Sequence, residues 1–107
     1  MSLDVSLYVT KPCEVYTNNI THNLVPMAKE AGLYEWLWRP HGIGIVKAGD
    51  LIVPLRDGLA RLAAEPDRFK ALNPPNDWGA YHELLGFVRA YLDACIEHPD
   101  ATVGVSR

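Results

Sequence analysis

The chain has 107 residues, 49% hydrophobic and 21% charged, which is typical of one folded soluble domain. Its formal net charge is −3, and its ten lysines and arginines are spread along the chain. Because phosphate-backbone binding uses clustered basic residues, this pattern argues against nucleic acid as a partner. No segment has the pattern of a secretory leader or the length of a membrane span. We expect a single globular domain over 1–107, no membrane contact and a cytoplasmic location.

Three segments have the pattern of β-strands. Residues 3–10 alternate apolar and polar side chains strictly, and residues 101–106 do so near the other end. Residues 14–20 are rich in residue types that favour strands, and they follow the first segment after Lys11 and Pro12. We expect a hairpin from the first two segments, with the last strand beside it in a small, mostly antiparallel sheet.

Between these strands the apolar residues recur with helical spacing. Pro26 falls in a first turn, Gly32 is a natural stop, and Pro40 ends an aromatic segment. Pro54 either lies in a first turn or bends its helix. The expected helical segments are 24–31, 33–38, a stripe from about 50 to 62, and 81–96. The predicted class is α+β, with about three strands, the N- and C-terminal ones included, packed against four to five helical segments.

Motifs for catalysis and cofactors are missing from the sequence. Residues 41–47, HGIGIVK, hold only two glycines of a dinucleotide fingerprint, and no phosphate loop or nucleophile elbow occurs. Cys95 and His98 share a helical face, but a metal site needs three or four ligands. We read both cysteines as thiols and expect no metal, no cofactor and no catalytic residue.

Polar and aromatic residues gather at three junctions, 18–23, 38–41 and 73–82. Helix caps and turns account for part of them, with Asn23 as the expected cap of the first helix and Asn76 or Asp77 as that of the last. The surplus amide, imidazole, guanidinium and aromatic groups are typical of a pocket for a small polar or planar ligand. In that pocket the first helix N-terminus and Arg39 would attract an anion, and His22 would stand apart from the scaffold. The candidate ligand-binding residues are Asn19, Thr21, His22, Arg39, Asn73, Trp78 and Tyr81.

Four short motifs carry a resemblance: NITHNL at 19–24, WRP at 38–40, LNPPNDWGAY at 72–81 and VSR at 105–107. Together they resemble a group of short phage, prophage and bacterial proteins to which no activity is assigned. The resemblance implies an accessory protein that meets a host factor or a host signalling molecule. It implies no functional residue.

Two functions from different classes follow from these observations. The first is a non-enzymatic interaction module of phage or bacterial type that binds a protein partner, or its own copy as a homodimer, through residues 33–38 and the neighbouring loops. The alternative is a binding protein or small enzyme for a nucleotide-like or anionic ligand, with its pocket at the three junctions. An exposed patch around Trp36 and Trp38 would favour the interaction module. A concave site that joins His22 to Trp78 would favour the ligand.

Overall fold

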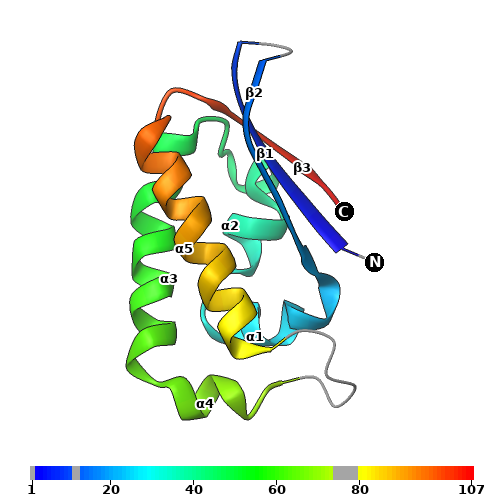
Figure 1. The fold of residues 1–107 in the computed structure, drawn as a ribbon, viewed down its shortest axis with the longest axis vertical. Helices are drawn as coiled ribbons and strands as arrows, with labels where there is room; N and C mark the ends of the chain where they lie inside the picture. Colours follow the sequence, from blue (N-terminus) through cyan, green and yellow to red (C-terminus); the bar gives the residue numbers. More distant parts are fainter. Residues whose placement is uncertain (1, 11–12, 74–79) are drawn as a thin grey trace.

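The structure, a computed structural model, describes residues 2–10, 13–73 and 80–107. In this part of the chain three strands form one antiparallel sheet in the order β2-β1-β3. The strands are β1 (Ser2–Thr10), β2 (Cys13–Thr21) and β3 (Thr102–Ser106). The helices lie on one side of the sheet (Figure 1) and are α1 (Val25–Glu30), α2 (Tyr34–Trp38), α3 (Ile52–Ala64), α4 (Pro66–Lys70) and α5 (Tyr81–Glu97). The predicted α+β class is confirmed.

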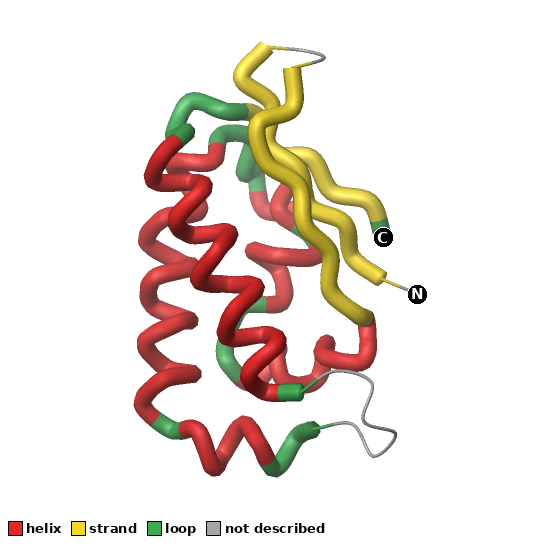
Figure 2. The backbone as a smooth tube through the Cα atoms, viewed as in Figure 1, coloured by secondary structure: helices red, strands yellow, loops and turns green. Residues whose placement is uncertain are grey.

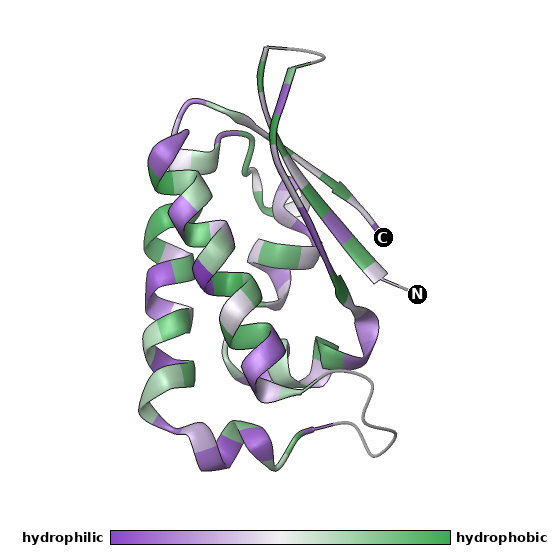
Figure 3. Ribbon diagram, in the orientation of Figure 1, coloured by the Kyte–Doolittle hydropathy of each residue, from purple (hydrophilic) through white to green (hydrophobic). Residues whose placement is uncertain are grey.

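The central strand β1 has one buried and one polar face. Leu3, Val5 and Leu7 are completely buried, whereas Asp4 between them is exposed. Figure 3 shows this alternation as bands of opposite hydropathy along β1. Because side chains of a strand point alternately to the two faces, the buried face packs on the helices and sets the register of the whole sheet.

Prolines and one glycine set the ends of the short helices as predicted. Pro26 lies in the first turn of α1, and Gly32 follows that helix with φ 73°, which favours glycine. α2 ends at Trp38, directly before Arg39 and Pro40. Pro54 is the third residue of α3, so it occupies the first turn, where its missing N–H costs nothing, and does not bend the helix. The expected stripe ends with α3, and a separate short helix, α4, begins at Pro66.

The helices α3 and α5 lie side by side and form the outer layer (Figure 2). α5 also crosses the sheet, where Tyr91 stacks on Tyr16 of β2 with ring centroids 5.9 Å apart. At Gly58 of α3 the backbone lies so close to Leu33 that an added Cβ would be 2.2 Å from a leucine methyl carbon. In the described ranges, the helices are all too short or too polar to cross a membrane.

The two outer edges of the sheet differ. Along β3, Ala48 donates its N–H to the carbonyl of Ala101 and Val103 donates its N–H to the carbonyl of Val46, both at 2.9 Å. The imidazole of His41 donates through Nε2 to the carbonyl of Val103, also at 2.9 Å. The segment 41–48 therefore covers the first half of this edge. No comparable segment hydrogen-bonds to the outer side of β2 through backbone groups of the described residues.

Candidate functional site

A groove opens at the end of the sheet where all three strands have an end. The register pairs Ser2 with Thr21 and Asp4 with Ser106, so the start of β1 lies between the ends of β2 and β3. The groove has a volume of about 580 Å³. It is lined by His22, Val25, Tyr34, Trp38, Arg39 and Arg107. We call this space the sheet-end groove.

Two stacked aromatic rings form one wall of the sheet-end groove. Tyr34 and Trp38 are one helical turn apart on α2, and their rings stack with centroids 5.8 Å apart and planes 15° from parallel. Trp38 is only 2% exposed, so the bulk of its ring belongs to the core. The accessible part of the wall is therefore mainly the half-buried ring of Tyr34, which suits a planar group.

His22 is bound to this wall. The indole Nε1–H of Trp38 donates to Nδ1 of His22 at 2.8 Å. Because Nδ1 accepts this bond, the neutral imidazole carries its proton on Nε2. His22 lies in a 3₁₀ turn, His22–Leu24, directly after β2, so this bond joins the end of a strand to the end of α2.

Two guanidinium groups border the groove. Arg39 donates through Nε to the hydroxyl of Tyr34 at 3.2 Å, and Arg107 donates through Nη1 to the carbonyl of Trp38 at 3.5 Å. Among the described residues neither arginine forms an ion pair, whereas Arg68 elsewhere pairs with two glutamates. The ammonium of Lys29 lies 4.9 Å from the centre of the Tyr34 ring, but Lys29 lines a different hollow, which it shares with Glu35. With its two arginines the groove is a positively charged region on a protein of net charge −3.

A smaller hollow of about 170 Å³ adjoins the groove. It shares Trp38, Arg39 and Arg107 with the groove and extends it along residues 40–42 to Val105 of β3. The two arginines therefore border both hollows, one beside His22 and one beside Val105, and we call the two hollows together the concave strip.

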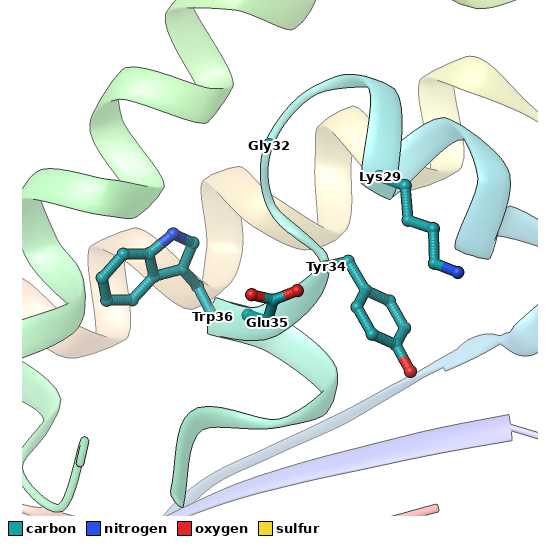
Figure 4. A pocket seen from close by; sticks show the side chains of 5 residues that line it. All are labelled: Lys29, Gly32, Tyr34, Glu35 and Trp36. Carbon is teal, nitrogen blue, oxygen red and sulfur yellow. The ribbon is translucent and has the colours of Figure 1, made fainter. Parts of the chain in front are cut away.

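A third hollow of about 340 Å³ also borders Tyr34, and its other lining residues are Lys29, Gly32, Glu35 and Trp36 (Figure 4). Figure 4 shows Trp36 pointing away from Tyr34, with Glu35 between them in the chain. The carboxylate of Glu35 in its lining makes this hollow less suitable for an anion. Because Trp38 is buried and Trp36 is half-buried, the aromatic segment does not form the exposed patch that would have favoured the interaction module.

Of the predicted site residues, the structure brings His22 and Arg39 together in the sheet-end groove. Thr21 lies next to them but caps the 3₁₀ turn, because its Oγ1 accepts the N–H of Asn23 at 3.2 Å. The prediction that Asn23 is the cap of the first helix is wrong, because a 3₁₀ turn precedes α1 and places Leu24 at the N-cap position of that helix. Asn19 is exposed, and its N–H donates to the side chain of Asn18 at 2.8 Å.

Asn73 and Tyr81 have scaffold roles in the structure. The side-chain oxygen of Asn73 accepts the N–H of Tyr81 at 2.8 Å, at the first residue of α5. Tyr81 is buried and donates its hydroxyl to the carbonyl of Leu62 at 2.6 Å, so it joins α5 to α3 and does not line the groove. The predicted residues Asn76, Asp77 and Trp78 lie outside the described part of the chain.

Sequence reasoning missed three residues of the groove, Val25, Tyr34 and Arg107. Tyr34 had a usable signal, because it precedes Trp38 by one helical turn in an aromatic segment. Arg107 had none, since only the pairing of β3 with β1 places it near Trp38.

The other candidate chemistry gives no second site in the described residues. Cys95 is buried, and this burial raises the pKa of its thiol to about 12, so it is a poor nucleophile and metal ligand at neutral pH. His98 is the C-terminal cap of α5 as expected of a helix-end histidine. Within residues 2–10, 13–73 and 80–107, no group of three His, Cys, Asp or Glu side chains is placed to hold a metal ion.

Comparison with known proteins adds no relative. The chain matches no family model, no curated protein and no solved structure. The resemblance to phage and bacterial proteins stays a prediction.

Proposed function

We propose that the protein is a binding protein that holds an anionic group, a carboxylate or a phosphate, in the sheet-end groove. One observation carries the proposal: Arg39 and Arg107, neither paired with a carboxylate of the described residues, border the same concave site as the Tyr34–Trp38 stack. A guanidinium group presents several N–H donors in one plane and matches a carboxylate or phosphate in geometry as well as charge.

The size and surface of the groove favour a small or narrow ligand. A volume of about 580 Å³ lies within the range of roughly 300–1,000 Å³ that is usual for small-molecule sites. The aromatic wall would bind the apolar or planar part of the ligand, while the arginines bind its charge. The lining contains no carboxylate side chain and no thiol, and Nδ1 of His22 is occupied, so these residues support binding more than catalysis.

An NMR titration tests this function. Acetate, benzoate and inorganic phosphate are added separately to ¹⁵N-labelled protein, with benzyl alcohol as the uncharged counterpart of benzoate. The proposal predicts saturable shifts of the Trp38 indole N–H and the Arg39 Nε–H with the anions, tightest with benzoate because it also contacts the aromatic wall. Benzyl alcohol should bind much more weakly. Shifts that are absent, or as large with the alcohol, would contradict the proposal.

A second function, self-association, is favoured by the open edge of β2. The N–H of Val103 points away from β1. In an antiparallel sheet the backbone groups of successive residues point alternately to the two sides of a strand. With the registers of β3 on β1 and of β1 on β2, this alternation makes the backbone N–H and C=O of Thr17 point to the outer side of β2. Glu14 is the one charged residue of this strand, so little charge opposes pairing with a second copy. We therefore propose an antiparallel homodimer through β2, centred near Thr17.

Light scattering distinguishes the dimer from an 11.9 kDa monomer. Thr17→Lys would place two lysines opposite each other at the centre of the dimer, so it should yield the monomer at micromolar concentration. Ala63→Lys, on the exposed side of α3, is the matched control and should leave the mass unchanged. A wild-type protein that is monomeric at high micromolar concentration would contradict the dimer and leave the groove proposal standing.

A further inference from the structure

The open part of the β3 edge adjoins the arginines of the groove. In an antiparallel sheet every second residue of an edge strand turns its N–H and C=O outward. On β3 the outward residues are Val103, whose two backbone groups are bound by Val46 and His41, and then Val105. Among the described residues nothing hydrogen-bonds to the outer side of Val105. Val105 is itself one of the residues that line the smaller hollow, together with Arg39 and Arg107.

An extended peptide could pair with the unused backbone groups of Val105 and also reach the two arginines. A strand added to a sheet edge forms main-chain hydrogen bonds with the outward groups, and its alternate side chains point into neighbouring pockets. A peptide residue opposite Val105 would lie between β3 and residues 40–42, within reach of the two guanidinium groups. The next residues would follow the concave strip into the sheet-end groove, past the aromatic wall.

We infer that the ligand is an extended acidic segment of a partner protein, which pairs with β3 at Val105 and places a carboxylate against Arg39 and Arg107. The inference rests on the proposed anion-binding function and adds the class of partner. The charge on the strip selects an acidic segment over a neutral or basic one, because the two arginines lack ion-pair partners in the described residues. The covered half of the edge, up to Val103, defines where the added strand must end.

The probe is a five-residue peptide of alternating valine and glutamate with both ends blocked, compared with acetate, which supplies the carboxylate alone. Binding is measured on the full chain by NMR titration. The inference predicts that the peptide binds at least about tenfold more tightly than acetate and shifts the Val105 amide. The same peptide with lysine in place of glutamate should not bind. A version with methylated backbone nitrogens should bind about fivefold or more weakly, by the loss of its hydrogen bonds to the edge.

A variant of the protein removes a hydrogen bond of the same edge by deleting a donor of the protein, where the methylated peptide deletes donors of the ligand. Val105→Pro deletes the outward N–H, which an edge strand tolerates, and should weaken the peptide about fivefold more than it weakens acetate, which forms no hydrogen bond to the edge. The methylated peptide on the wild-type protein keeps the inference testable if this variant fails to fold.

The outcomes separate the two proposals. If acetate binds and the peptide binds no more tightly, or if the peptide shifts the Thr17 amide of β2 in place of Val105, the inference is wrong and the anion-binding function stands. If acetate, benzoate, phosphate and the peptide all fail to bind, the proposed function is wrong and the inference fails with it.

Discussion

The indole N–H of Trp38 donates to Nδ1 of His22 across 2.8 Å, and this bond joins the end of β2 to the end of α2. His22 therefore belongs to the scaffold of the groove as well as to its lining. The sequence predicts an imidazole apart from the scaffold, so that His22→Ala would leave stability nearly unchanged. The structure reverses that expectation, because a buried donor depends on this residue.

We expect His22→Ala to lower the free energy of unfolding by about 1–3 kcal/mol. The cause is the Trp38 indole N–H, which would be left without an acceptor in a side chain that is 2% exposed. Urea denaturation measures the change. His82→Ala, on the exposed side of α5, is the control and should stay within about 0.5 kcal/mol of wild type. Equal stability of both variants would show that the indole bond contributes nothing.

Substitution by alanine should have opposite effects on stability at Gly58 of α3 and at Gly86 of α5. Gly86→Ala should stabilise the protein by about 0.5–1 kcal/mol, because the space around it is open and alanine is the better helix former. Gly58→Ala should destabilise by about 1–3 kcal/mol, because its methyl group would overlap the buried Leu33. Thermal melts of the pair check the packing of α3, and a stabilising Gly58→Ala would mean that Leu33 lies elsewhere.

The hydroxyl of Tyr91 is buried and, among the described residues, has no hydrogen-bond partner. Burial also raises the pKa of this phenol well above its ordinary value. We expect Tyr91→Phe to increase the free energy of unfolding by about 1 kcal/mol, since it removes an unsatisfied polar group and keeps the ring that stacks on Tyr16. A loss of stability in chemical denaturation would indicate that the hydroxyl has a partner after all.

Alkaline pH should destabilise the protein through Cys95. The ordinary pKa of a cysteine thiol is 9.0, and burial raises that of Cys95 to about 12. Above pH 9 the unfolded chain therefore loses the proton first, so the stabilising contribution is complete below pH 9 and is lost as the pH rises toward 12.

Thiol labelling checks the same burial directly. In the native protein at pH 8 to 9 a thiol reagent should modify the exposed Cys13 and leave Cys95 unmodified. In denaturant both thiols should react. The control is Cys13→Ser, which should show no rapid native labelling. Two rapidly reacting thiols in the native wild type would contradict the buried position of Cys95.

Most of the strands and helices could be predicted from the sequence, because the patterns that specify them are local. The alternation in β1, the leucines of α3 and the prolines at helix starts each act within a few residues. Only part of the groove lining could be predicted from the sequence. Arg107 and Val105 come close to it through the pairing of β3 with β1, which links residues about a hundred positions apart. Asn73 and Tyr81 do not line the groove, and the sequence could not show this because capping and an inter-helix hydrogen bond use the same polar groups as a ligand site.

The central claim is that Arg39 binds an anion in the sheet-end groove, and the benzoate dissociation constant of Arg39→Gln tests it most directly. Arg39 is exposed and unpaired with any carboxylate of the described residues, so the variant should keep its stability within about 0.5 kcal/mol. Loss of a charge-assisted hydrogen bond of roughly 1.5–3 kcal/mol should weaken benzoate by about ten- to a hundredfold. Arg56→Gln, an exposed arginine of α3, controls for net charge and should bind like wild type. Equal benzoate affinity of wild type and both variants would contradict the account.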